Sequence, residues 1–484
     1  MSSSILLLVL NFWPLASPQE ARWPQFLGPG GMAVAEAPPR SLEFDLEKDV
    51  VWRVALPRGA SSPCILDERI FLTAAEGEDL LMLAFARKTG AELWRHRRRA
   101  GAIPTVHADA DVAAPTPCTD GKHVVFYFGT FGLVTLDPDG NLLWEKRLPF
   151  PEAVLGIGTS PILVDDMVIL TRDGCPDSGV YAFTSSNGKE RWSVPHLGYT
   201  FSFGTPFVWR NAARRELVVA GTQRLTGIGL KDGKELWQLA GLTSLVCTTP
   251  TADAETLYFA AWSTSDAARD ERAQVTWGEL VISAEELSNS RLLFDRLDVD
   301  ADAKLQFAEF PESRARDVFA YLDTNGDGVV TPEELAPIVE RPRGQGENLL
   351  VAVAPGGTGD ISKTHVRWSF RRGLPYVSSP LLYEGRLYMV SAGGLLTCLD
   401  PKNGTPFFDR ERLADHGEYY ATPVGVGGHL IVCSSNGTIH VLRAADEFQL
   451  VRSVELGESI HATPAIVDGT IYLRSERSLW AFGK

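Results

Sequence analysis

The sequence is short of positive charge. It has 46 Lys and Arg against 61 Asp and Glu, a net charge of −15. Nucleic-acid partners need a basic surface that neutralises phosphates, so this balance argues against them. The basic run at residues 95–99, RHRRR, is interpreted as a solvated strand end. Beyond the N-terminus there is no apolar run of about 18 residues, which argues against a membrane span and predicts a soluble mature chain.

Cysteine is also scarce. The 484 residues include six cysteines, and no two of them are adjacent. Most fall in or beside apparent strands, which predicts buried, small, apolar side chains rather than ligands. Their spacing compels no disulfide.

The N-terminus begins with a short apolar run followed by small residues, MSSSILLLVLNFWPLAS. This pattern is typical of an export signal, so we expect residues 1–21 to be a signal peptide and the protein to be periplasmic or extracellular. No Lys or Arg precedes the run, and residues 16–21 contain no clean small-x-small cleavage motif. No cysteine follows the run, so a lipid anchor is not supported.

A repeated unit fills most of the chain and is clearest at residues 204–239. Small apolar groups separated by polar or glycine turns predict four short strands in this unit. Its strongest turn is KDGK at residues 231–234, because Asp and Gly tolerate positive φ. One such meander cannot cover its own apolar face and must stack on copies of itself.

A Ser/Thr-Pro pair opens each copy. These pairs occur at Ser62-Pro63, Thr116-Pro117, Ser160-Pro161, Thr205-Pro206, Thr249-Pro250, Ser379-Pro380, Thr422-Pro423 and Thr463-Pro464. The prolines are 54, 44, 45, 44, 130, 43 and 41 residues apart, so only the fifth interval holds an insertion. A period of roughly 40 to 45 residues with four strands per unit predicts an all-β, eight-bladed β-propeller.

The two ends of the chain complement each other. Residues 49–56, DVVWRVAL, resemble a fourth strand without its first three, and residues 462–484 supply three strands and stop. We therefore expect the N-terminal strand to complete the last blade and close the ring, which removes two exposed sheet edges. The expected domains are a propeller at residues 22–262 and 347–484 and an insertion at residues 263–346.

A motif precedes the fourth strand of several units, as in RKTGAELW (87–94), DPDGNLLW (137–144), SNGKERW (186–192) and KDGKELW (231–237). These stretches resemble the A-x-D-x-x-T-G-K-x-x-W repeat of pyrroloquinoline-quinone-type (PQQ-type) propellers, a group that includes non-enzymatic scaffold proteins of outer-membrane assembly. WPQFLGP (23–29), FYFGTFGLVTLDPDGNLLW (126–144) and GTGDISKTHVRW (357–368) resemble exported propellers of planctomycete-type bacteria. The resemblance implies that each Trp docks between neighbouring blades, and it leaves the activity undefined.

The insertion changes from strand to helical periodicity. Ser283 to Glu286 has the form of a capping box, and Leu287, Ser290, Phe294 and Leu297 follow at the spacing of one helix. The insertion joins the second strand of its blade to the third, so antiparallel order places it on the face that carries the interblade loops. Residues 265–343 hold 18 Asp and Glu against 9 Lys and Arg, a net charge of −9.

Two twelve-residue stretches of the insertion place oxygen ligands at positions 1, 3, 5 and 12, as in the loops of an EF-hand pair. They predict two calcium sites. The first-loop ligands are Asp298, Asp300, Asp302, Lys304 (carbonyl), Gln306 (through water) and Glu309. The second-loop ligands are Asp323, Asn325, Asp327, Val329 (carbonyl), Thr331 and Glu334.

The two loops differ in the residue at position 6. The second loop has Gly328 there, whereas the first has Ala303, and a non-glycine residue at positive φ costs about 1 kcal/mol or more. The second site should therefore bind calcium more tightly. A metal-free first loop is the alternative.

Two functions are compatible with these features. A quinoprotein dehydrogenase would hold PQQ in the central funnel beside a catalytic Asp, and its larger alcohol-oxidising relatives stack the quinone between a Trp and a disulfide of adjacent cysteines. Adjacent cysteines are absent here, and the calcium ligands lie in the insertion rather than in a funnel. PQQ is therefore disfavoured and no catalytic residue is assigned.

The favoured function is a non-enzymatic binding scaffold for an unidentified protein or small molecule. Its ligand face would be the one that carries the insertion. Aromatic and polar residues precede the Ser/Thr-Pro pairs there: residues 106–111 (including His107, Asp109 and Asp111), residues 199–203, Tyr376, Tyr419, Tyr420 and His461. They form either a ligand-binding ring around the channel mouth or loops that pack among themselves. A metal site at His107, Asp109 and Asp111 alone would be weak.

Overall fold

The structure is a computed structural model that describes residues 22–100, 111–149, 157–173, 178–196, 201–263, 275–277, 280–312, 316, 319–323, 325–339 and 346–483. The predicted signal peptide, residues 1–21, lies outside these residues. No helix within the described ranges has both the length and the apolar character needed to cross a bilayer.

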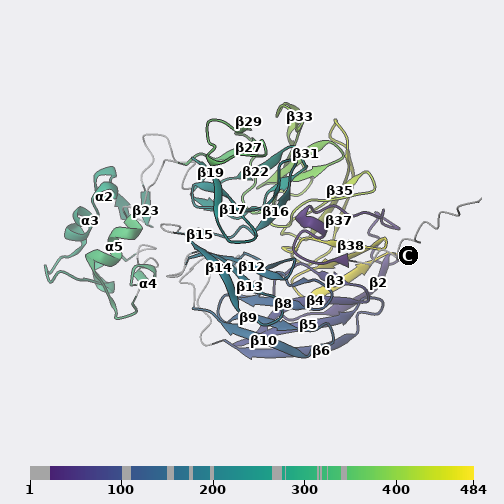
Figure 1. The fold of residues 1–484 in the computed structure, drawn as a ribbon, viewed down its shortest axis with the longest axis horizontal. Helices are drawn as coiled ribbons and strands as arrows, with labels where there is room; N and C mark the ends of the chain where they lie inside the picture. The colour runs from purple at the N-terminus through teal and green to yellow at the C-terminus, as the bar shows by residue number, and fades with distance from the viewer. Residues whose placement is uncertain are drawn as a thin grey trace, which may run out of the picture.

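Eight four-stranded antiparallel blades form a propeller, which confirms the predicted fold (Figure 1). Blades 1 to 4 contain β3 (Cys64–Leu66), β4 (Arg69–Glu76), β5 (Asp79–Ala86), β6 (Glu92–Arg99); β7 (Cys118–Thr119), β8 (Val124–Phe128), β9 (Gly132–Leu136), β10 (Leu142–Arg147); β11 (Ile162–Val164), β12 (Met167–Arg172), β13 (Gly179–Thr184), β14 (Glu190–Pro195); and β16 (Phe207–Arg210), β17 (Arg215–Gly221), β18 (Arg224–Ile228), β19 (Glu235–Ala240). Blades 5 to 8 contain β21 (Thr251–Ala252), β22 (Leu257–Ala261), β27 (Leu349–Val353), β29 (Val366–Phe370); β30 (Leu381–Tyr383), β31 (Arg386–Ser391), β32 (Leu395–Leu399), β33 (Pro406–Arg412); β34 (Val424–Val426), β35 (His429–Cys433), β36 (Thr438–Arg443), β37 (Leu450–Glu455); and β38 (Ala465–Val467), β39 (Thr470–Arg474), β40 (Ser478–Phe482), β2 (Val50–Ala55).

Burial follows from the stacking of blades. The middle strands of a blade are covered on both faces, so β8 and β9 are continuous apolar runs with every residue buried. The outer strands alternate, as β2 does between exposed and half-buried residues. In every blade the register shifts between the third and fourth strands, a bulge that twists the outer edge and disfavours pairing with another chain.

The Ser/Thr-Pro pairs form a closed ring of hydrogen bonds. The backbone N–H of each Ser or Thr donates to the hydroxyl of its counterpart in the next blade, as from Ser160 to Thr205 (3.1 Å) and from Thr205 to Thr249 (3.2 Å). The series runs through all eight blades and ends with Thr463 N donating to Ser62 Oγ at 3.0 Å. All eight residues are buried. Each hydroxyl thus accepts a bond from a buried donor that the sheet ladders do not reach.

Tryptophans make a second set of contacts between blades. Trp144 Nε1 donates to Ser185 O in the next blade at 2.6 Å, and its ring covers Gly188, where an added Cβ would lie 2.6 Å from the ring. Equivalent pairs join Trp52 to Gly90, Trp94 to Gly140, Trp192 to Gly233 and Trp368 to Gly404. The implied docking role of the tryptophans is confirmed at these positions.

Trp237 is the exception. Its Nε1 donates to the buried carboxylate of Glu216 in its own blade at 3.0 Å, and Arg214 pairs with the same carboxylate at 2.7 Å. The reason is that blade 5 has no short turn before its fourth strand. The connecting segment instead reaches back to blade 4, where β28 (Gly359–Asp360) pairs in parallel with β19.

Both chain ends contribute to closure. β2 pairs with β40, as predicted, so the first residues complete the blade that the last residues begin; Figure 1 shows purple β2 beside the yellow C-terminal strands. The preceding segment crosses the face opposite the interblade loops. It adds β1 (Arg22–Trp23) to blade 1 and turns through the short helix η1 (Pro29–Gly31). It then makes backbone hydrogen bonds to Gly425 in blade 7 and to Gly469 in blade 8.

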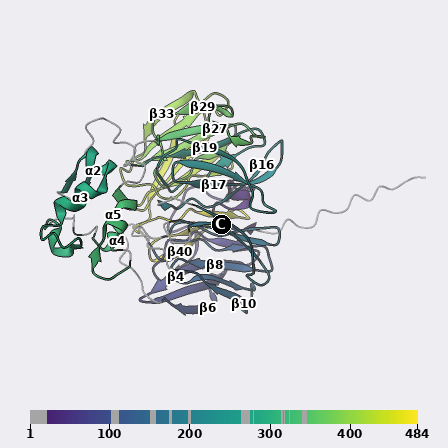
Figure 2. The same cartoon turned by 60° about the vertical axis from the view of Figure 1, so that its left-hand side comes forward.

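The insertion leaves the ring between β22 and β27, on the face of the interblade loops, as the strand order predicts. Two further small sheets are present. β15 (Phe201–Ser202), between blades 3 and 4, pairs with β20 (Leu245–Val246), between blades 4 and 5, and β23 (Val275–Trp277) pairs with β24 (Leu280–Ile282) near the start of the insertion. The insertion's helices α2 (Ala284–Ser288), α3 (Ser290–Leu297), α4 (Phe319–Leu322) and α5 (Pro332–Val339) gather beside the ring in both views (Figures 1 and 2).

The single helix expected after Ser283 is divided into two helices in the structure, α2 and α3. The capping box at Ser283 and Glu286 is present, but α2 ends at Ser288 and Asn289 is extended (φ −144°, ψ 91°). The Asn289 side chain then accepts a hydrogen bond from Arg291 N and caps α3. A residue that favours caps over helix interiors therefore interrupts the expected helix.

The hydroxyl ring is testable at Thr205. Thr205→Val keeps the side-chain shape but leaves the N–H of Ser160 buried without an acceptor, so the free energy of unfolding should fall by about 1–3 kcal/mol. Thr205→Ser retains the hydroxyl and should stay closer to wild type. Urea denaturation of the three proteins checks this, and equal losses in both variants would contradict it.

Blade 7 contains a buried histidine in a polar network. His440 Nε2 contacts Tyr419 Oη at 3.0 Å, and its Nδ1 contacts Ser453 Oγ at 2.9 Å. Burial lowers the pKa of His440 to about 4, and the charge of Asp415 opposes that shift only in part. The folded protein therefore holds this imidazole neutral.

This depressed pKa predicts acid sensitivity. Between pH 6.5 and 4 the unfolded chain binds a proton at His440 that the folded chain does not, so the free energy of unfolding should fall with pH by up to about 1.4 kcal/mol per unit. His440→Gln keeps a hydrogen-bonding side chain without the titration and should lack this part of the slope. Denaturation of both proteins at several pH values measures the difference, and parallel curves would refute the assignment.

Candidate calcium sites and a cavity on the loop-bearing face

The insertion brings its two acidic loops side by side. β25 (Leu305–Gln306) and β26 (Val329–Val330) pair across them, with Leu305 opposite Val330. The helices around this pair bury a separate apolar core that includes Phe294, Phe310 and Leu335. This core sets the two loops in fixed register.

In the first loop the carboxylates of Asp298, Asp300 and Asp302 offer oxygens that lie within 4.8 Å of one another. Backbone N–H groups orient them: Asp298 accepts from Ala303 N at 3.1 Å, and Asp302 accepts from Lys304 N at 2.8 Å. Desolvation and the repulsion of neighbouring carboxylates raise the pKa of Asp300. Oxygen donors crowded in this way suit a hard divalent cation.

The other residues predicted as ligands of the first loop lie next to this cluster. Glu309, at position 12, accepts from Val299 N and Gln306 N at 2.8 Å each, so its carboxylate closes the loop. The Gln306 amide donates to Asp302 at 2.8 Å. Lys304 directly precedes β25, where its carbonyl occupies position 7.

The second loop repeats these contacts. Asp323 accepts from Gly328 N at 2.9 Å, Asn325 accepts from Asp327 N at 2.8 Å, and Glu334 accepts from the Thr331 hydroxyl at 2.9 Å. Val329, the predicted carbonyl ligand, lies in β26. Oxygen-bearing side chains thus stand at equivalent positions in both loops, and these residues would hold the ions.

Position 6 has positive φ in both loops, as predicted: 87° at Gly328 and 64° at Ala303. Only the first loop bears the strain of a Cβ in that conformation. The two loops therefore share this backbone conformation and differ in the side chain that it carries, which is the difference from which unequal affinities are predicted.

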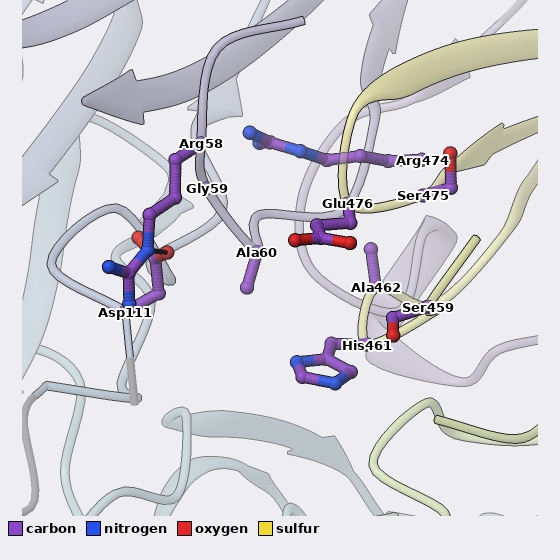
Figure 3. Close-up of a pocket in the computed structure, with 10 residues that line it drawn as sticks. All are labelled: Arg58, Gly59, Ala60, Asp111, Ser459, His461, Ala462, Arg474, Ser475 and Glu476. Carbon is purple, nitrogen blue, oxygen red and sulfur yellow. Dashed lines mark hydrogen bonds and ion pairs between the residues drawn. The ribbon is translucent and has the colours of Figure 1, made fainter. Parts of the chain in front are cut away.

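A cavity of about 370 Å³ opens among the interblade loops next to the last blade. Its lining comes from the connections after β2 and β37, from the turn after β39, and from Asp111 (Figure 3). The lining residues are Arg58, Gly59, Ala60, Asp111, Ser459, His461, Ala462, Arg474, Ser475 and Glu476. Its described lining therefore comes from blades 1 and 8 and from the connection that precedes blade 2.

Arg474 fixes one wall of this cavity. Its guanidinium is buried and donates to Ser61 Oγ and Thr73 O at 2.7 Å each and to Pro57 O at 3.3 Å. Gly59 is required beside it, because an added Cβ would lie 2.3 Å from Nη2. Burial lowers the pKa of Arg474 to about 10, with the charge of Asp111 opposing the shift, so the group stays charged at neutral pH.

The structure divides the residues predicted for the channel mouth. His461 lines the cavity and packs edge-on against Tyr420, with ring centroids 5.0 Å apart, and Tyr376 packs against Trp262. Tyr419 is buried in blade 7 and does not reach the mouth, which corrects that part of the prediction. His107, Asp109 and Tyr199 lie outside the described residues.

Sequence reasoning missed Arg58, Arg474 and Glu476. Arg474 ends a strand of apolar residues, and Arg172 ends the corresponding strand of blade 3. A buried arginine at a strand end was therefore a readable signal. The basic run at residues 95–99 is structural: Arg95 and Arg97 on β6 pair with Glu76, and Arg99 pairs with Glu78.

A family model described as outer membrane protein assembly factor BamB matches residues 29–157 and 111–275, just over half of the chain. The chain belongs to this family. A second family model, described as EF hand, matches residues 315–336 in the insertion of this BamB-family protein. This match supports the second loop as an EF-hand. No curated protein matches the sequence.

Solved structures resemble the propeller at low identity. BamB from Moraxella catarrhalis is 11% identical with a TM-score of 0.55, covering 90% of this chain and 99% of that one. A europium-containing methanol dehydrogenase is 10% identical with a TM-score of 0.56, covering 96% and 98%. Quinohemoprotein alcohol dehydrogenase ADHIIG from Pseudomonas putida HK5 is 10% identical with a TM-score of 0.55, covering 96% and 80%. These likenesses show the fold alone.

Calcium titration tests the two loops of this BamB-family protein. Glu334→Gln removes the carboxylate that closes the second loop and should abolish the tighter binding step. Ala303→Gly relieves the strain at positive φ and should tighten the weaker step severalfold. Isothermal titration calorimetry of wild type and both variants measures the steps. Absence of binding at millimolar calcium, or unfolding of the propeller on chelation, would refute the prediction.

Proposed function

We propose that this protein is an exported, calcium-binding propeller that acts as a non-enzymatic binding scaffold. Residues 1–21 would be its signal peptide, residues 22–262 and 347–484 its propeller, and residues 263–346 its EF-hand insertion. BamB-family membership supports a periplasmic or extracellular location. The stretches that resemble planctomycete-type exported propellers support it as well.

One observation carries the proposal: the acidic insertion and the cavity share the face of the interblade loops. A bridge between Leu242 and Glu347 ties the end of the insertion to the connection between blades 4 and 5. Calcium at the loops would neutralise part of the insertion's negative charge and brace it beside this face. The unidentified partner or small ligand would dock there, and nucleic acid would not.

The alternative, a quinoprotein dehydrogenase, is favoured by the fold that this chain shares with the methanol dehydrogenase. The cavity lining offers no support for a bound quinone. Its lining contains no tryptophan, and the 484-residue sequence contains no adjacent cysteines to stack on the other face. The acidic cluster found among the described residues is in the insertion, away from the ring's interior.

Reconstitution distinguishes the two functions. Purified protein is mixed with PQQ and calcium, examined for the quinone's absorption after gel filtration, and assayed by dye-linked oxidation of a set of alcohols and sugars. The scaffold function predicts no stoichiometric quinone retention and no turnover. Retained quinone together with turnover of any substrate would overturn it in favour of the dehydrogenase.

A further inference from the structure

The cavity beside the last blade has two walls of opposite charge. The loop at residues 57–61 and Asp111 form the first wall, against which the Arg474 guanidinium lies. The loop at residues 459–462 and the turn at residues 475–476 form the second. Figure 3 shows Arg58 and Asp111 on one side of Ala60, and Glu476, Ser459 and His461 on the other.

Among the described lining residues, the first wall has an excess of positive charge. The wall carries two guanidinium groups, those of Arg58 and Arg474. Arg58 Nε forms an ion pair with Asp111 Oδ2 at 2.9 Å, so Asp111 balances the charge of one of them. Arg474 donates only to carbonyl and hydroxyl oxygens, and within the described residues no carboxylate lies at ion-pair distance from it. Those dipoles solvate the charge of Arg474 but do not cancel it.

The second wall has an excess of negative charge. The Glu476 carboxylate has neither an ion pair nor a hydrogen bond in the part of the chain that the structure describes, and the side chain is exposed to the cavity. Its backbone is fixed, because Glu476 N donates to Ser459 O at 2.9 Å. The Ser459 side chain and the His461 imidazole stand beside it as further polar groups.

Both walls are held before any ligand arrives. The hydrogen bonds of Arg474 to Ser61 and Thr73 anchor the first wall to blade 1. Ser475 Oγ donates to the buried Glu458 carboxylate at 2.6 Å, which anchors the turn that carries Glu476. The Arg474 guanidinium and the backbone that carries Glu476 are therefore fixed in advance, which limits the conformational entropy lost on binding.

We propose that this cavity binds a small zwitterion of the amino-acid class. The ligand's ammonium group pairs with Glu476, and its carboxylate faces Arg58 and Arg474. The volume of about 370 Å³ suits a small molecule of this size and excludes a folded partner. The inference deepens the proposed function and rests on it, since it takes the loop-bearing face as the ligand face.

The test uses the full chain and free L-alanine, L-leucine, L-glutamate and L-lysine as probes in isothermal titration calorimetry. At least one should bind with a dissociation constant of about 1 mM or below. Its N-acetyl and its amide derivatives should each bind at least tenfold more weakly, because each lacks one of the two charges. Glu476→Gln should weaken the free amino acid by the same factor and leave the N-acetyl derivative unchanged.

Glu411→Gln is the matched control, since Glu411 is also exposed and lies on β33 in blade 6, two blades from the last blade of the ring. It changes the net charge equally and should leave binding unchanged. The inference is overturned if no probe binds, if Glu476→Gln leaves the dissociation constant of the free amino acid unchanged, or if the N-acetyl or amide derivative binds as tightly as the free amino acid. These outcomes leave calcium binding and the absence of quinone turnover untouched, so failure here is distinct from failure of the scaffold function.

Discussion

Closure of the ring depends on one interaction repeated around it: a backbone N–H that donates to the hydroxyl of the next blade's Ser or Thr. Each residue of the series is both donor and acceptor, so the set is complete only when the last blade meets the first. The bond from Thr463 to Ser62 spans 401 residues of sequence. Since all of these groups are buried, an open ring would leave a donor and an acceptor without partners in an apolar environment.

Because that inner ring is constant, the outer parts of the blades can vary. Trp237 donates to Glu216 within blade 4 instead of docking on the next blade, and β28 pairs with β19, the outer strand of blade 4. The insertion replaces a turn between two strands that remain paired from Leu257 opposite Val353 to Ala261 opposite Leu349. A loop of this length costs little more closure entropy than a short one, provided that its ends stay paired.

The charged groups of the insertion and of the cavity lie on the same side of the ring. The insertion's acidic loops leave the ring on the face of the cavity, and the opposite face is crossed by the N-terminal segment that bonds to Gly425 and Gly469. The insertion and the cavity therefore lie on the face that the N-terminal segment does not cross. The cavity's own charges are local and of both signs, whereas the charge of the insertion is of one sign and acts over a longer range.

Sequence alone determined the number of blades, the closure by residues 49–56, the face of the insertion and the positions of its two acidic loops. These follow from short-range patterns, because a Ser/Thr-Pro pair, a strand period or a twelve-residue loop is complete within its own segment. The break at Asn289 was a local conflict that the helical period concealed. Only the tertiary structure decided that the Ser/Thr hydroxyls bond to one another, that Trp237 departs from its set, and that Arg58, Arg474 and Glu476 meet at one cavity. Those residues come from loops separated by some 400 positions, and the distance between them is set by the stacking of blades, which no local pattern records.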